Sequence, residues 1–124
     1  MIKSISFLPE FIDLVRTGEK TVTRRIKTNL KPGDICYFKA GRTGKKEGYI
    51  KIIEVTLSKL KMVNIPYYKE EKYQEYNREG FYNPMSYMLN FIDTWNKLHK
   101  EMGSRWKDNP EVKRIEFEYI GEKL

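Results

Sequence analysis

The chain has 124 residues, of which 40% are hydrophobic and 33% are charged, which predicts one folded domain, residues 1–124, rather than a disordered segment. No apolar run approaches the ~20 residues that cross a bilayer, and a start without the apolar stretch of a signal peptide leads us to expect a cytoplasmic protein. A single cysteine and a single histidine exclude an internal disulfide and argue against a zinc site.

The basic charge is concentrated in the first half of the chain. The formal net charge is +7, with +8 in residues 1–61 and −1 in residues 62–124. Such an asymmetry favours a polyanionic partner, most simply nucleic acid. The alternative is ordinary surface charge that keeps the protein in solution.

The first half of the sequence predicts mainly strands. Leu8, Phe11, Ile12 and Val15 follow helical spacing, and Gly18 suits the left-handed position after a helix. Alternating or β-branched segments on either side of this helix predict strands at residues 2–7, 21–23, 35–40 and 49–57. A turn is expected at residues 31–34, and residues 41–48 are expected to form an exposed, basic hairpin loop.

The second half of the sequence predicts two helices and a final strand. Helices are expected from Ile65 to about Asn77 and from Asn83 to about Leu98, with Tyr82 stapled onto Tyr87. The buried stripe of the second helix should contain Met85, Met88, Phe91, Ile92, Trp95 and Leu98. After a loop at residues 103–110, a final strand is expected at residues 112–120.

These elements predict an α+β fold. A last strand that returns to an early sheet implies a small, closed or half-closed β-barrel of about five to six strands with about three flanking helices. Closure would also remove exposed strand edges.

Residues 18–25 combine hydroxyls and cations where the chain must turn. Lys20 acts as a base only if burial or neighbouring cations lower its pKa, and Arg24 and Arg25 are close enough in sequence to contribute. Thr23 is then a candidate nucleophile or hydrogen-bond partner. In a regular strand residues 20 and 23 face opposite sides, so they converge only if the chain bends. The alternative is a solvated lysine beside a structural strand threonine.

Glu79 precedes Gly80 in a tight connector and is a candidate proton donor or acceptor. The alternative is an ordinary glutamate at a helix end. Tyr82 is the candidate for stacking on a base, although tyrosines of an amphipathic helix more often serve packing. We expect Cys36 to be a thiol in the core and His99 to be a surface imidazole at a helix end.

The order of four motifs resembles the ASCH domain family of the PUA-like superfamily. The motifs are the opening helix with residues 18–25, the Lys-Pro-Gly-Asp turn at 31–34, the Glu-Gly pair at 79–80, and the last strand at 112–117. The resemblance implies a small PUA-like β-barrel with helices around a cleft that binds RNA or a nucleoside or nucleotide. Cationic side chains that would face phosphates are Lys20, Arg24, Arg25, Lys39, Arg42, Lys45 and Lys46, and Thr21 is a further ligand-binding candidate.

One branch of the family is similar to amidohydrolases that deacetylate N(4)-acetylcytidine. By that resemblance Lys20 would activate Thr23 for attack on the acetyl carbonyl, and Glu79 would handle the proton of the leaving amine. A metal-independent ribonuclease is a further alternative that relatives suggest. The chain differs from the short hydrolase-like branch by Arg24, where an apolar residue is usual, and by a longer Tyr-rich middle. We expect no cofactor or metal, no membrane, and a monomer.

Overall fold

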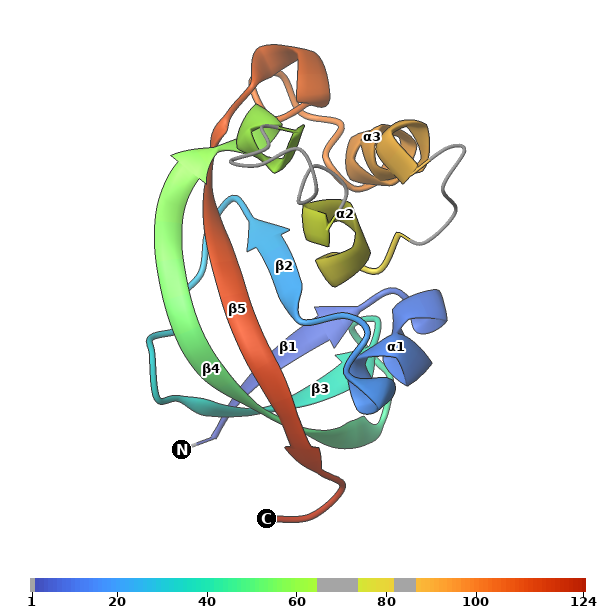
Figure 1. The fold of residues 1–124 in the computed structure, drawn as a ribbon, viewed down its shortest axis with the longest axis vertical. Helices are drawn as coiled ribbons and strands as arrows, with labels where there is room; N and C mark the ends of the chain where they lie inside the picture. Colours follow the sequence, from blue (N-terminus) through green and yellow to red (C-terminus); the bar gives the residue numbers. More distant parts are fainter. Residues whose placement is uncertain (1, 65–73, 82–86) are drawn as a thin grey trace.

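The computed structural model describes residues 2–64, 74–81 and 87–124, and it shows the expected α+β fold. Five strands form one mixed sheet, and the helices lie together on one side of it (Figure 1). No helix in these described ranges is long and apolar enough to cross a membrane.

The sheet runs in the order β1-β3-β4-β5-β2. Its strands are β1 (Lys3–Phe7), β2 (Val22–Arg25), β3 (Ile35–Ala40), β4 (Lys46–Lys59) and β5 (Glu111–Gly121). β1 pairs in parallel with β3, while the β3–β4, β4–β5 and β5–β2 pairs are antiparallel. The long strands β4 and β5 curve together across the whole sheet (Figure 1), and their register shifts near Ile53. Shifts of this kind bend a sheet.

Of the two expected forms, a closed or a half-closed barrel, the closed one is not found, because the sheet stays open between its edge strands β1 and β2. No ladder joins these two strands in the described ranges. The Arg25 side chain crosses the opening, since its Nη2 donates a hydrogen bond to the carbonyl oxygen of Ser6. β1 leads directly into the helical turn η1 (Pro9–Phe11) and the helix α1 (Ile12–Thr17), so the chain leaves the sheet before it can pair with β2.

Four further helical segments lie within the described ranges. They are η2 (Leu60–Asn64), α2 (Gln74–Arg78), α3 (Tyr87–Leu98) and η4 (Trp106–Asp108). The expected helix over residues 65–77 is confirmed only for α2, because residues 65–73 lie outside the described ranges. The start at Asn83, the Tyr82–Tyr87 staple and Met85 also fall outside the description. The loop predicted at 103–110 contains η4.

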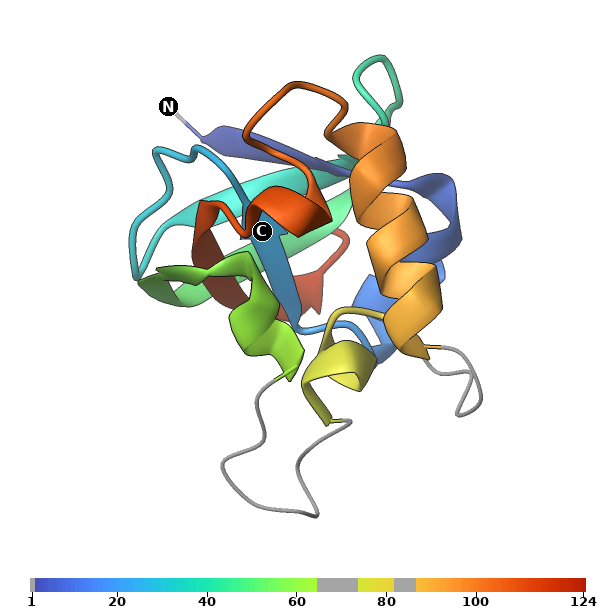
Figure 2. The same ribbon diagram turned by 90° about the horizontal axis from the view of Figure 1, so that it is seen from above.

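The buried stripe of α3 is narrower than its sequence predicts. Phe91 and Trp95 are buried, but Met88 is 39% and Leu98 57% exposed. Phe91 and Trp95 are buried because they pack in one cluster with Tyr76 and Val112, to which Met88 and Leu98 do not belong. α3 stands at the side of the sheet instead of lying flat on it (Figure 2).

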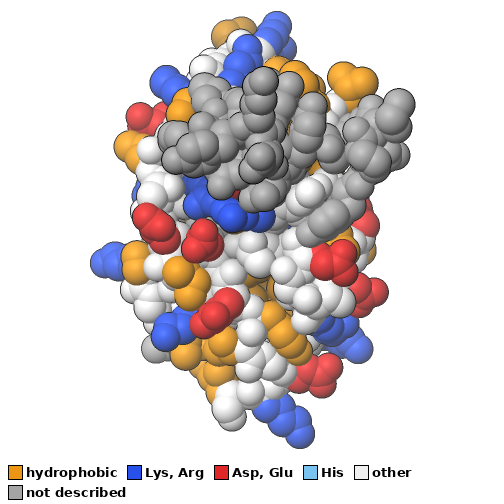
Figure 3. Space-filling view, viewed as in Figure 1, with side chains coloured by type: hydrophobic (Ala, Val, Ile, Leu, Met, Phe, Trp, Pro, Cys, Tyr) orange, Lys and Arg blue, Asp and Glu red, His pale blue; other side chains and the backbone are white. Residues whose placement is uncertain are grey.

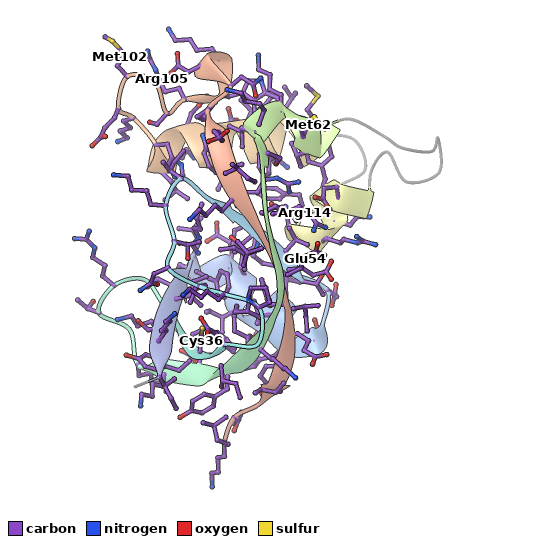
Figure 4. The ribbon with its side chains drawn as sticks, turned by 90° about the vertical axis from the view of Figure 1, so that its left-hand side faces the viewer. Cys36, Glu54, Met62, Met102, Arg105 and Arg114 are labelled. Carbon is purple, nitrogen blue, oxygen red and sulfur yellow. The ribbon has the colours of Figure 1, made fainter. Side chains whose placement is uncertain are left out.

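Two hydrophobic cores lie on the two halves of the sheet. The first joins β1, α1, β3 and the middle of β4 and β5, and it holds Cys36 as the sequence predicts (Figure 4). Burial raises the pKa of the Cys36 thiol to about 11. The second core joins η2, α2, α3 and the start of β5 around Tyr76, Phe91 and Trp95. The space between the cores contains polar side chains.

Gly80 allows the connector after α2 to approach η1. Its φ of 102° lies in the region that favours glycine. A Cβ at this position would lie 2.8 Å from Cδ1 of Phe11. The carbonyl oxygen of Arg78, two residues earlier, accepts a backbone hydrogen bond of 2.8 Å from Thr21, which fixes the connector beside the entry to β2.

We predict that Gly80→Ala lowers the free energy of unfolding by about 2 to 4 kcal/mol, since it adds a clash to an unfavourable backbone conformation. Gly103→Ala is the matched control, because Gly103 also has a positive φ, of 89°, but no atom within 4 Å of an added Cβ. It should cost only about 1 kcal/mol. Equal losses in urea denaturation would contradict the role assigned to the Phe11 contact.

Candidate functional site

A pocket of about 480 Å³ lies between the edge strands and under α3. Ser6 and Phe7 come from β1, Phe11 from η1, and Thr23, Arg24 and Arg25 from β2. Phe91, Trp95 and His99 form the α3 side. Lys20 and Glu79 complete the polar part of the wall. The cavity between the unpaired edge strands β1 and β2 is therefore the candidate binding site.

Lys20 enters the pocket because the chain reverses after α1. Gly18 ends that helix in the left-handed conformation with φ 81°. The backbone N–H of Lys20 then donates to the carbonyl oxygen of Leu14 over 2.9 Å. The lysine therefore precedes β2 on a bend, and its side chain turns inward until only 3% is exposed. The bend needed to bring Lys20 to the side of Thr23 is present.

Lys20 is held by oxygen atoms and aromatic rings. Its Nζ donates to the carbonyl oxygens of Val22 over 2.9 Å and Glu79 over 2.6 Å, and it lies 3.5 Å from Oε1 of Glu79. The ring centroids of Phe11 and Phe7 are 4.8 and 5.7 Å away. Desolvation lowers the pKa of Lys20 to about 8, although Glu79 acts to raise it and Arg25 lowers it further.

Arg24 is buried in a network of ion pairs. Its Nη1 lies 2.6 Å from Oε2 of Glu79, and its Nη2 pairs with Glu75. Glu75 also accepts two hydrogen bonds from Arg114, of 2.6 and 3.0 Å. Arg24 and Arg114 are direct cross-strand neighbours on β2 and β5. Two like charges at such positions repel each other, and Glu75 removes this repulsion by bonding both.

Sequence reasoning missed Glu75 and Arg114. Arg114 projects from β5 toward α2 (Figure 4). The available signal was the spacing of Glu75 and Glu79, which at i and i+4 reach the same side of a helical segment. Burial alone would raise the pKa of Glu75, but the hydrogen bonds and charges of Arg114 and Arg24 outweigh it and hold the pKa at about 2.

Thr23 lies beside Lys20 in the pocket and is 6% exposed. Lys20, Thr23 and Glu79 thus line one cavity. In the described part of the chain, Lys20 and Thr23 share no hydrogen bond, because Lys20 Nζ is turned toward the carbonyl oxygens of Val22 and Glu79. The three side chains are neighbours, but they do not form a hydrogen-bonded relay in this state.

Two arginines lie at the cavity wall beyond Lys20. Arg25 bonds to Ser6, and its guanidinium carbon lies 5.7 Å from the centre of the Phe7 ring. Burial lowers the pKa of Arg25, and Glu79 opposes this effect. Arg42 lines the cavity from the loop between β3 and β4, which lies beside the C-terminal end of α3 (Figure 2).

The other predicted ligand-binding residues lie elsewhere. Thr21 bonds through its backbone to Arg78 and Phe117 and does not line the cavity. Tyr82 is outside the described ranges. Lys39, Lys45 and Lys46 belong to the β3–β4 hairpin outside the cavity, and Lys46 Nζ lies 4.6 Å from the ring centre of Tyr37. On the face seen in Figure 3, acidic and basic side chains are interspersed.

The aromatic side of the cavity is a second feature that sequence reasoning missed. The expectation of a surface imidazole at His99 is wrong, because its ring is half-buried and stacks on Trp95 with centroids 3.8 Å apart. Phe91, Trp95 and His99 succeed one another every four residues, so they lie along one side of α3 and its end. That spacing was the available signal.

No group of three or more metal-ligating side chains comes together among the described residues. The described side chains that line the cavity carry ammonium, guanidinium, hydroxyl, carboxylate, imidazole and aromatic groups.

Comparison with solved structures identifies the fold. An ASCH domain from Lactobacillus crispatus matches with a TM-score of 0.67 and 13% identity over 97% of this chain and 80% of that chain. A protein described only as hypothetical matches with a TM-score of 0.64 and 20% identity over 97% and 100%. An ASCH protein from Zymomonas mobilis matches with a TM-score of 0.52 and 16% identity over 98% and 72%. No family model and no curated protein matches the sequence.

We predict that Glu75→Gln removes stability that depends on pH. The pKa of Glu75 is lower in the folded protein than its ordinary value of 4.5, so its contribution is complete above about 4.5 and is lost as the pH falls toward 2. At pH 7 the variant should be less stable by about 1 to 3 kcal/mol, which allows for partial solvent screening. The difference from the parent protein should shrink below pH 4.5.

Urea denaturation between pH 2 and 7 measures this effect. Glu111→Gln is the control, because Glu111 is exposed on β5 and makes no ion pair in the described part of the chain. A stability difference that stays constant across this range would contradict the paired state of Glu75.

Proposed function

We propose that this chain, whose fold is that of ASCH domains, binds a nucleoside or nucleotide in the cavity between β1 and β2, either free or as part of RNA. The observation that carries the proposal is the composition of the wall. Aromatic rings on one side face four cationic side chains and one carboxylate, a combination that suits a flat base joined to a polar or anionic group. A volume of about 480 Å³ falls in the usual range for small-molecule sites.

The cations divide into two groups. Lys20 and Arg24 are engaged by Glu79 and by backbone or Glu75 oxygens. Arg25 uses one Nη2 bond to Ser6, and a guanidinium carries five N–H donors. Arg25 and Arg42 are thus the cations with donors to offer a phosphate, while His99, stacked on the buried Trp95, belongs to the aromatic wall that a base would meet.

An RNA strand would extend the contact over the β3–β4 hairpin. Lys39, Lys45 and Lys46 belong to the same hairpin as Arg42, which lines the cavity. Their charge belongs to the basic first half of the chain. A chain of phosphates that leaves the cavity past Arg42 would meet these lysines.

We predict that cytidine 5′-monophosphate binds the protein and that Trp95→Leu weakens binding by about 10-fold or more, because it removes the ring that supports His99 in the aromatic wall, and a stacking contact is worth roughly 1–3 kcal/mol. Arg42→Ala should weaken the nucleotide more than cytidine. Lys107→Ala is the matched control, since Lys107 is exposed on η4 and does not line the cavity. Calorimetric titration measures each affinity.

The salt dependence of binding to a short RNA tests the extended surface. Its log–log slope should be clearly negative and should become shallower in a Lys45→Ala, Lys46→Ala double variant. A slope near zero would contradict RNA binding by this face and leave the single nucleotide as the ligand.

A second candidate function is hydrolysis of N(4)-acetylcytidine, and the lowered pKa of Lys20 favours it. Neutral Lys20 would take the proton of Thr23, whose oxygen would bond to the acetyl carbon. The C–N bond would then break, with the proton taken up by Lys20 passing by way of the Glu79 carboxylate to the amine of cytidine, and water would release acetate from the threonine ester. This scheme requires Lys20 to exchange a carbonyl contact for the Thr23 hydroxyl when the ligand binds.

We predict that, if this scheme holds, the protein converts N(4)-acetylcytidine to cytidine and acetate at a rate that rises with pH through about 8, where Lys20 loses its proton. Lys20→Ala and Thr23→Val should abolish turnover, while Thr23→Ser should retain part of it. Chromatography of the products measures the rate. Absent turnover, or turnover undiminished by Lys20→Ala, would contradict this scheme, and RNA cleavage in a chelator would point to a ribonuclease instead.

A further inference from the structure

His99 is oriented by the carbonyl group of Trp95. Its Nδ1 lies 3.1 Å from that oxygen, and its backbone N–H donates to the same oxygen over 2.9 Å. A carbonyl oxygen only accepts hydrogen bonds, so Nδ1 must carry the proton. In a neutral imidazole the proton on Nδ1 leaves Nε2 as an acceptor.

The ring of His99 cannot turn without breaking other contacts. It stacks on Trp95 at an interplanar angle of 16°. Trp95 is itself anchored, because its Nε1 donates to the carbonyl oxygen of Ser104 over 2.8 Å and its ring stacks on Phe91. The imidazole is therefore positioned on a rigid support. None of the described residues forms a hydrogen bond with Nε2.

The surroundings lower the pKa of this imidazole. Burial lowers the pKa of His99, the hydrogen bond to Trp95 raises it, and the charge of Arg25 on β2 lowers it. The charged groups that line the same cavity are Lys20, Arg24, Arg25, Arg42 and Glu79. The single carboxylate among them is bound to Arg24 and Lys20, so it is not available to stabilise a protonated His99.

We propose that Nε2 of His99 accepts a hydrogen bond from an N–H or O–H group of the ligand and so determines which ligands the cavity selects. The inference rests on the proposed function, and it deepens it. Lysine and arginine side chains only donate hydrogen bonds. In a cavity rich in such donors, His99 supplies an acceptor that a nucleoside amino or hydroxyl group needs. A ligand without a donor at this place would leave Nε2 unpaired.

This role links binding to the protonation of His99. A proton on Nε2 turns the acceptor into a donor and places a charge near Arg25. A donor-bearing ligand must therefore bind more weakly as the pH falls. By reciprocity the bound ligand must lower the pKa of His99, because it stabilises the neutral form.

The test uses NMR of the single histidine and calorimetry with cytidine as the probe. The free protein at pH 7.5 should show the Nδ1–H tautomer. Cytidine should bind more weakly at pH 5.0 than at pH 7.5, with the loss following the His99 pKa that NMR measures in the free protein, and it should lower the pKa of His99. Lys20, with a pKa of about 8, stays mostly protonated in this range.

Two variants separate the acceptor from the stacking surface. His99→Phe keeps a ring on Trp95 but lacks the acceptor, so it should bind cytidine about 10-fold more weakly at pH 7.5 and without dependence on pH. His99→Gln carries an acceptor that does not titrate, so it should bind more tightly than His99→Phe, also without dependence on pH.

Several outcomes would overturn the inference. Finding the Nε2–H tautomer in the ligand-free protein would overturn it before any binding measurement. Binding that strengthens at acidic pH, a raised His99 pKa in the complex, or unchanged affinity in His99→Phe does so with ligand. Failure of cytidine and its nucleotide to bind, with the Nδ1–H tautomer intact, would contradict the proposed function itself and with it any role of His99 in selecting such ligands.

Discussion

The pairing of Glu79 with Arg24 and Lys20 is the interaction on which the rest of the site depends. All three side chains are at most 5% exposed. Charges at such depth cost several kcal/mol each to desolvate, and only their mutual attraction and further hydrogen bonds offset this cost. Glu79 sits where α2 ends, whereas Lys20 and Arg24 flank the start of β2. This ion cluster therefore fixes the connector after α2 against the edge of the sheet.

The buried cations Lys20 and Arg25 compensate for the missing pairing between the two edge strands of the open sheet. An edge strand leaves backbone oxygens without ladder partners, and such oxygens need donors when they are buried. Lys20 supplies one to Val22 on β2, and Arg25 supplies one to Ser6 on β1. The two side chains thus do locally what strand pairing would have done. They leave a cavity where a closed barrel would have had backbone contacts.

The cavity joins two surfaces with different tasks. Its polar wall belongs to the sheet and to the ion cluster, in which Lys20 and Arg24 are both paired with Glu79. Its aromatic wall belongs to α3, where Trp95 is held by Ser104 and in turn holds His99. The ion cluster determines which charges a ligand meets in the cavity, whereas the aromatic wall determines which ligand shapes fit. Selectivity depends on both.

The sequence by itself determined the α+β class, the strands, the first turn of helix and the burial of Cys36, because these follow from local periodicity and turn residues. It also indicated Lys20, Thr23 and Glu79 as candidates. Only the tertiary structure decided that the sheet stays open, that Glu75 and Arg114 complete the ion cluster, and that His99 faces the cavity. Strand closure, burial and partners depend on which distant segments meet, and no local pattern records that.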